Sequence, residues 1–260
     1  MDAAISLVLL LVQAVPALQS QGPVTPRQGT KERVASLTRQ LDWRRAATSE
    51  EERSVWNGIT DRIHEEINAY IRVLDAHLVK DEDLQDQLRD ILAPHASYDP
   101  ELIGPPLARI ADGPKGRALV ITYVLMRGLH DSTVTVRGYR SVDGRFQPVA
   151  STGSDFDRFG LFAANLPAPL PGEIWILAHG RAITFNGTLI RVRAYAFDGE
   201  RFRTLWGPED MLNANVRMTA NGFTIVRANE QPQKLPYRLQ DEYVLTLDGP
   251  IRVSSRSSAH

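Results

Sequence analysis

The chain has 260 residues, of which 43% are hydrophobic, and it carries a formal net charge of −1 at pH 7. This composition suffices for a hydrophobic core and excludes wholesale disorder, and the balanced charge gives no overall attraction to nucleic acid or anionic membranes. Because the sequence contains no cysteine, disulfide bonds, thiolate nucleophiles and cysteine-ligated zinc are also excluded.

The first residues form an apolar segment over positions 3–15 that ends in small residues. The segment is shorter than the roughly 20 residues of a membrane-spanning helix and has the length of the hydrophobic part of a secretory signal. No positive charge precedes it, so a buried N-terminal helix is the alternative. We predict a signal peptide over residues 1–20, a linker rich in Pro, Gly and Gln over residues 21–30, and a secreted or periplasmic protein.

Residues 31–95 are predicted to be helical, and Ser49 followed by Glu50 and Glu51 is typical of a helix start. Apolar residues then recur every three or four positions, as one stripe of a helix does: Trp56, Ile59, Ile63, Ile67, Tyr70, Leu74 and Leu78. A second, shorter helix is expected after Asp81. The pattern predicts a helical hairpin that packs on itself or on the rest of the chain, with a coiled-coil dimer as the alternative. The Pro- and Gly-rich residues 96–117 are expected to form a boundary loop.

Residues 118–255 are predicted to form an antiparallel β-domain. Alternating apolar and polar residues flank three Asp-Gly turns, at Asp143, Asp198 and Asp248, and such turns favour tight hairpins. The turns lie about fifty residues apart, a period typical of a four-stranded propeller blade. The fold class is therefore mainly β with an N-terminal helical hairpin, and the β-domain is blade-like or sandwich-like. We also expect valine to be tolerated less well at Gly199, in a turn, than at Gly172, in an ordinary loop.

The segment from Tyr195 to Phe202 has a strand, an Asp-Gly turn and an aromatic-bearing strand. In this respect residues 118–255 resemble the blade-type repeats of uncharacterised secreted bacterial proteins. The resemblance implies a propeller-like architecture and no particular activity. About three such units cannot close a ring of four or more blades. The expected arrangement is therefore an open stack, a sandwich, or a ring completed by a second copy.

Two sets of acidic residues are candidates for chemistry. Asp61, His64 and Glu65 share a helix face and could bind a metal ion at this spacing, but we interpret them as a solvated helix face. Asp155 and Asp157 form a pair that suits a calcium site or a glycosidase, with a polar turn as the simpler interpretation. The sequence contains no known catalytic motif.

Arginines offer the candidate binding site. Arg191 and Arg193 share one face of a predicted strand, and Arg201 and Arg203 share one face of the next, with Tyr195 nearby. Trp206 ends the second strand. Such a stripe could bind an anionic or sugar-like ligand through charge-assisted hydrogen bonds and stacking. The alternative is that these residues are the solvated positions of a half-exposed sheet.

These features favour a secreted, non-enzymatic binding or interaction module. An extracellular hydrolase that uses loop carboxylates, or a structural subunit completed by self-association, are the alternatives. The expected partner is an anionic polysaccharide or another protein. We expect no nucleic acid, no membrane span after signal cleavage, no metal and no cofactor.

Overall fold

The computed structural model describes residues 25–41, 47–93, 104–128, 131–153, 156, 160–168, 170–228 and 237–259. The predicted signal peptide lies outside these residues, as do Asp155 and Asp157. No helix in the described part of the chain combines the length and the hydropathy that a membrane crossing requires.

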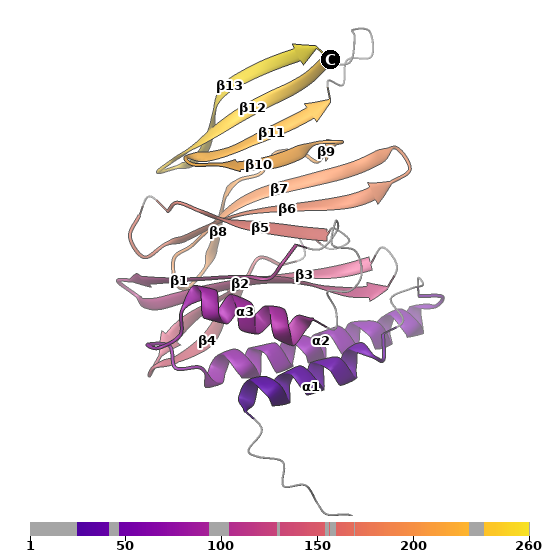
Figure 1. The fold of residues 1–260 in the computed structure, drawn as a ribbon, viewed down its shortest axis with the longest axis vertical. Coiled ribbons are helices and arrows are strands. Elements are labelled where there is room, and N and C mark those ends of the chain that lie inside the picture. Colours follow the sequence, from indigo (N-terminus) through magenta and orange to yellow (C-terminus); the bar gives the residue numbers. More distant parts are fainter. Residues whose placement is uncertain are drawn as a thin grey trace, which may run out of the picture.

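Helices come first, followed by strands in three antiparallel sheets (Figure 1). The helices are α1 (Pro26–Thr38), α2 (Glu50–Val73) and α3 (Asp81–Leu92). Sheet 1 contains β1 (Leu107–Gly113), β2 (Gly116–Gly128), β3 (Asp131–Val142) and β4 (Arg145–Ser151). Sheet 2 contains β5 (Gly160–Leu166), β6 (Ile174–Thr184), β7 (Gly187–Phe197), β8 (Phe202–Trp206) and the short β9 (Met211–Leu212). Sheet 3 contains β10 (Asn215–Thr219), β11 (Gly222–Ala228), β12 (Tyr237–Thr246) and β13 (Gly249–Ala259).

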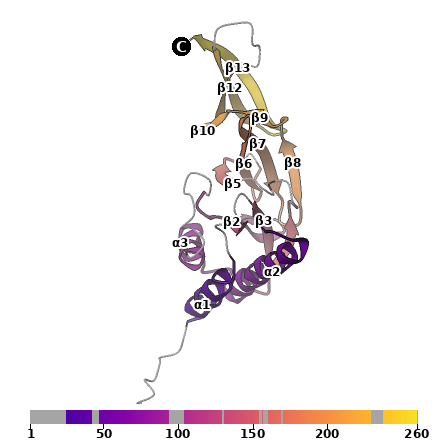
Figure 2. The same cartoon turned by 90° about the vertical axis from the view of Figure 1, so that its right-hand side faces the viewer.

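The strands of each sheet follow one another in chain order, except that β9 pairs with β7. The prediction of a mainly β protein with N-terminal helices and an antiparallel β-domain is confirmed. The three sheets stack on one another along the long axis of the molecule, and the helices lie against sheet 1 (Figures 1 and 2).

Two elements begin earlier than the sequence suggested. Helix α1 starts inside the expected linker because Thr25 accepts a hydrogen bond from the Gln28 amide at 3.3 Å and Pro26 occupies the first turn. Proline is well suited there, since the first-turn amides have no partner within the helix. Strand β1 and the start of β2 lie in the expected boundary loop, where they form a short hairpin. Prolines and glycines in these two segments led to the prediction of loops, but in the structure they begin a helix and join two strands.

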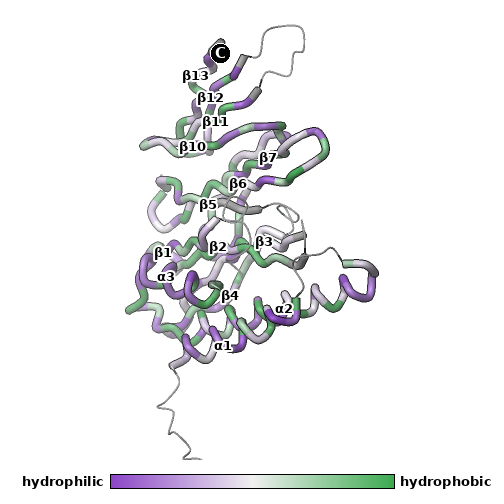
Figure 3. The backbone as a smooth tube through the Cα atoms, turned by 45° about the vertical axis from the view of Figure 1, so that its right-hand side comes forward, coloured by the Kyte–Doolittle hydropathy of each residue, from purple (hydrophilic) through white to green (hydrophobic). Residues whose placement is uncertain are grey.

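Sheets 1 and 2 are the inner layers of the stack, and each has a hydrophobic core on both of its faces. Along β2, odd-numbered residues such as Leu119 and Ile121 pack against the helices, whereas Val120 and Val124 pack against sheet 2. A third core joins sheet 2 to sheet 3 and includes Trp175. Because both faces of the inner sheets are covered, a strand such as β2 is apolar at successive positions and not on one face alone. Figure 3 shows the hydropathy of the residues along these strands.

The contact between sheets 1 and 2 depends on small residues and surface charges. A side chain at Gly138 would overlap the ring of Phe197, which packs on this glycine. At the rim, the Lys115 ammonium lies 3.0 Å from Asp198 and 2.9 Å from Glu200. Glu200 also receives a hydrogen bond from the Arg140 guanidinium at 2.9 Å. Sequence-distant turns are thereby joined at the edge of the stack.

The expectation that Gly172 lies in an ordinary loop and tolerates a side chain better than Gly199 is wrong. Gly199 has a positive φ of 91°, as expected for its turn. Gly172, expected in an ordinary loop, also has a positive φ of 81°, and a Cβ there would lie 2.4 Å from the Gly113 Cα. The backbone of sheet 1 approaches this loop so closely that Gly172 is the more constrained position.

Candidate functional site

The arginines of the proposed stripe do not share one face of sheet 2. Arg191 and Arg193 on β7 share a face with Tyr195, which packs against sheet 1. Arg203 on β8 is paired with Ala196, a residue of the core between sheets 2 and 3. Arg203 therefore lies on the face opposite to Arg191 and Arg193, Arg201 precedes β8, and the four arginines do not form a single stripe.

Most of these arginines contact neighbouring protein groups. Arg191 donates two hydrogen bonds to the Asp210 carboxylate, from Nε at 2.8 Å and from Nη2 at 2.7 Å, and these bonds lower the pKa of Asp210. Arg193 donates to a backbone carbonyl of the loop that follows β8. Arg203 Nη2 lies 3.3 Å from Glu173 Oε1. A ligand would have to compete with these partners.

Arg201 and the aromatic residues have different surroundings. The Arg201 side chain is 85% exposed, and its ion pair with Asp198 is long, at 4.0 Å. Arg201 is therefore the most accessible of the four arginines. Tyr195 is 2% exposed and belongs to the core. Trp206 packs with Tyr243 across the interface between sheets 2 and 3, with ring centroids 4.8 Å apart. Ligand binding by the exposed arginines stays a prediction, and the two aromatic residues serve packing.

The outward surface of sheet 3, which we call the terminal face, is covered by no described element (Figures 1 and 2). Phe223 and Ile225 point to sheet 2, so the alternate positions of β11 and their cross-strand neighbours point away from it. The terminal face comprises Arg217, Thr224, Val226, Arg238, Gln240, Glu242, Val244, Ile251, Ser254 and Arg256. Ile251 is 52% exposed.

The charge of the terminal face is mainly positive. Arg217, Arg238 and Arg256 are exposed, and none of them forms an ion pair with another described residue. The two inward-pointing arginines of sheet 3 differ, because both lie near the buried Asp241 carboxylate, at 3.3 Å and 3.7 Å. Sheet 3 therefore neutralises its inner arginines and presents its outer ones to solvent.

A polar strip crosses the otherwise apolar interface between α2 and sheet 1. His64 Nδ1 lies 2.8 Å from the Tyr123 hydroxyl and 3.2 Å from Thr135 Oγ1. One turn along the helix, the Tyr139 hydroxyl donates to Asn68 Oδ1 at 2.6 Å. Burial raises the pKa of both tyrosines, so each hydroxyl keeps its proton at neutral pH.

The position of His64 corrects one expectation. His64 is only 7% exposed and lies against sheet 1, so the interpretation of Asp61, His64 and Glu65 as one solvated helix face is wrong for the histidine. Asp61 and Glu65 are exposed. Within the described residues no group of histidine and carboxylate side chains is placed to hold a metal ion.

A small cavity opens beside this strip, and we call it the α2 cavity. It has a volume of about 220 Å³. Its polar lining comes from α2, β3 and the end of β4: Asp61, His64, Thr133, Thr135, Arg137 and Ser151. Asp61 and Ser151 are exposed, so the cavity opens to solvent.

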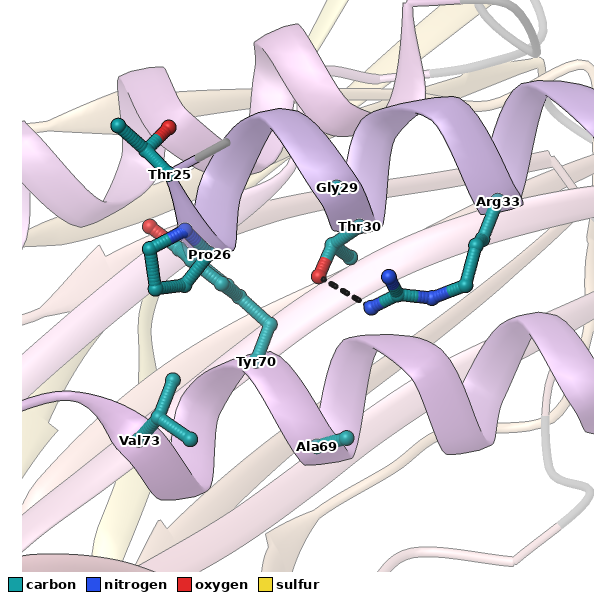
Figure 4. A pocket seen from close by; sticks show the side chains of 8 residues that line it. All are labelled: Thr25, Pro26, Gly29, Thr30, Arg33, Ala69, Tyr70 and Val73. Carbon is teal, nitrogen blue, oxygen red and sulfur yellow. Dashed lines mark hydrogen bonds between the residues drawn. The ribbon is translucent and has the colours of Figure 1, made fainter. Parts of the chain in front are cut away.

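A second cavity, of about 330 Å³, lies between α1 and α2 (Figure 4). Its polar groups interact with one another or with neighbours. The Arg33 guanidinium donates to Thr30 Oγ1 at 3.2 Å and to Glu66 at 2.6 Å, and the Tyr70 hydroxyl donates to Gln87 at 2.6 Å. We interpret this cavity as a packing gap between the helices.

Comparison with known protein families, curated proteins and solved structures finds no match for this chain. The resemblance to blade-type repeats stays an interpretation of short motifs. The chemistry of the terminal face and of the α2 cavity is therefore the basis for assigning a function.

The residues of the α2 cavity had a weak signal in the sequence. Thr133, Thr135 and Arg137 alternate with Val134 and Val136, which shows that one face of this strand is polar. Such a pattern ordinarily indicates a solvent-exposed face, and here that face is covered by a helix. The terminal face had a similar signal in β10, where the outward Arg217 lies between the apolar Val216 and Met218.

Proposed function

We propose that the chain is a secreted or periplasmic binding module without enzymatic activity, and that its terminal face docks an acidic surface of a partner protein. One observation carries this proposal. The outer face of sheet 1 is covered by the helices. The outer face of sheet 3 instead combines the exposed Ile251 and the half-buried Val226 and Val244 with three arginines that form no ion pair with another described residue. Stacked structures normally end in a capping element with a polar outer face.

Charge favours an acidic partner over a second copy. Three arginines and Glu242 are the charged groups at the outward positions of the described strands of sheet 3. A symmetric pairing of two terminal faces would bring like charges together, which opposes association. Arginine and exposed aliphatic side chains on a flat surface suit a protein interface better than a sugar chain, which is usually held by aromatic stacking or a groove.

The test compares the wild type with a variant in which Arg217, Arg238 and Arg256 are all replaced by Gln. Affinity capture from an extract of the source organism should enrich an acidic protein with the wild type and not with the variant. The purified partner should then bind the purified wild type, with an affinity that falls as the salt concentration rises. Ile251→Ser should weaken the same binding without changing its dependence on salt.

Three controls make the result specific. Phe185→Ala alters an exposed apolar residue on the β6–β7 hairpin and should leave binding unchanged. Light scattering should show that the wild type alone does not dimerise through the terminal face. Binding of heparin or alginate that depends on the three arginines would identify a polysaccharide module instead. Reconstituted binding that the triple variant retains would contradict the proposal.

A further inference from the structure

A half-buried cation faces the α2 cavity. Arg137 lies on the helix-covered face of β3, between Thr135 and Tyr139, and forms no ion pair with another described residue. Its positive charge lies near the Tyr139 hydroxyl, which burial keeps neutral. Because no described residue supplies a counter-ion for this partly desolvated charge, an anion in the cavity would stabilise the arrangement.

Hydroxyl groups surround the same space. Ser151 is directly opposite Arg137 in the pairing of β3 with β4, and Thr135 is opposite Tyr123 in the pairing of β2 with β3. Together with His64 they offer several hydrogen-bonding groups around one guanidinium. An arginine supported by hydroxyls suits the planar oxygens of a carboxylate, which it can bind through two parallel hydrogen bonds.

The rim of the cavity carries the opposite charge. Asp61 lines the cavity one helical turn before His64 and forms no ion pair with Arg137. A ligand between them would meet a cation at one end and a carboxylate at the other. The volume of about 220 Å³ is below the roughly 300–1,000 Å³ of sites for drug-sized molecules, so the ligand must be small.

We infer that the α2 cavity binds a small carboxylate that carries an amino or hydroxyl group close to its carboxyl group. Arg137, Thr135 and Ser151 bind the carboxylate, and Asp61 accepts a hydrogen bond from the amino or hydroxyl group. This site is separate from the terminal face, which lies on the far side of the stack (Figure 1). It gives the binding module a small-molecule ligand in addition to its protein partner.

Calorimetric titration of the full chain with acetate, lactate, glycine and inorganic phosphate tests the inference. We expect saturable binding of lactate or glycine, with an affinity about tenfold higher than that of acetate. Arg137→Gln should lower the affinity for each carboxylate by about tenfold or more. Asp61→Asn should remove the advantage of lactate and glycine over acetate while leaving acetate binding unchanged.

Matched variants separate binding from folding. Arg140→Gln changes an arginine on the same strand whose side chain lies on the opposite face and contacts Glu200, and it should bind like the wild type. Ser151→Ala removes an exposed hydroxyl from the cavity and should weaken binding several-fold even if Arg137→Gln fails to fold. The inference is overturned if the wild type binds none of the carboxylates at millimolar concentration, if phosphate binds best, or if a folded Arg137→Gln variant binds normally.

Discussion

Two glycines set the distance between sheet 1 and the loop that precedes β6. A Cβ added to Gly113 would lie 2.9 Å from the Gly172 Cα, and a Cβ added to Gly172 would lie 2.4 Å from the Gly113 Cα. Both distances are shorter than real Cβ contacts, so the two backbones touch without side chains between them. This contact involves backbone on both sides, and a rotamer change cannot relieve it.

Valine at Gly172 should therefore be more harmful than valine at Gly199. Both variants incur the strain of a β-branched residue at positive φ, roughly 1–3 kcal/mol. Gly172→Val adds a backbone clash, whereas a Cβ at Gly199 would meet the Lys115 Cβ at an ordinary 3.7 Å. Thermal melts should show the larger fall in midpoint for Gly172→Val.

Gly153→Val is the matched control for backbone strain alone, because Gly153 has a φ of 76° and no atom lies within 4 Å of its added Cβ. It should behave like Gly199→Val. Equal midpoints for Gly172→Val and Gly199→Val would show that the stack tolerates a wider separation at this contact.

His179 on β6 should make the stability dependent on pH. Burial, followed by the positive charge of Arg181, lowers the pKa of His179 from 6.5 to about 4. Between these values the unfolded chain binds a proton that the folded chain does not, so this residue destabilises the fold as the pH falls from about 6.5 to about 4. Thermal midpoints of the wild type should drop over this interval, and those of His179→Gln should drop less. His77→Gln, at an exposed histidine, should keep the pH profile of the wild type.

The packing of α2 on sheet 1 combines an apolar core with a few buried hydrogen bonds. Tyr139 and Asn68 are both buried, and their hydrogen bond of 2.6 Å fixes the position of the helix along β3. The apolar contacts around them are not directional and would allow the helix to slide. Polar pairs of this kind determine which residues of α2 meet which residues of the sheet.

Tyr139→Phe should destabilise the protein by about 1–3 kcal/mol, because the Asn68 acceptor loses its donor while remaining buried. Denaturant unfolding of this variant, of Asn68→Leu and of the double variant gives the coupling energy. The double variant should be less destabilised than the sum of the single variants, and strict additivity would mean that the two groups do not interact.

The positions of strands and turns could be predicted from the sequence better than the side of the sheet on which each residue lies. The Asp143-Gly144 hairpin forms with φ of 51° and 73°, as the Asp-Gly turn predicts, because turn chemistry is local. The arginines could not be placed from alternation alone, since their faces depend on the β7–β8 pairing and on its register shift between Ala194 and Tyr195. Likewise, the alternation in β3 identifies a polar face but not the helix that covers it.

At the scale of the whole molecule, each layer contacts only the layers next to it. Sheet 3 packs against sheet 2 alone among the described elements, whereas sheet 1 is held between the helices and sheet 2. The sequence predicted the sheets, but their order in an open stack follows from core contacts between residues far apart in the chain. Such contacts leave no local pattern in the sequence.

Hydrogen exchange should reveal this difference between layers. In a stack with nearest-neighbour contacts, the end layer opens at a lower free energy than the inner ones. Backbone amides of β11 and β12 should therefore exchange faster than those of β2 and β3, even though each of these strands is paired on both sides. Uniform exchange across the sheets would show that the stack unfolds as a single cooperative unit.

The open stack also determines how the molecule would respond to force. Helix α1 and the end of β13 lie at opposite ends of the long axis (Figure 1). Tension applied between them would load the interfaces between layers in series, so that every interface carries the full force. Among the described elements, sheet 3 is the end layer and is held through one interface only. The interface between sheets 2 and 3 should therefore separate first, which lengthens the molecule while the helix-covered half stays folded.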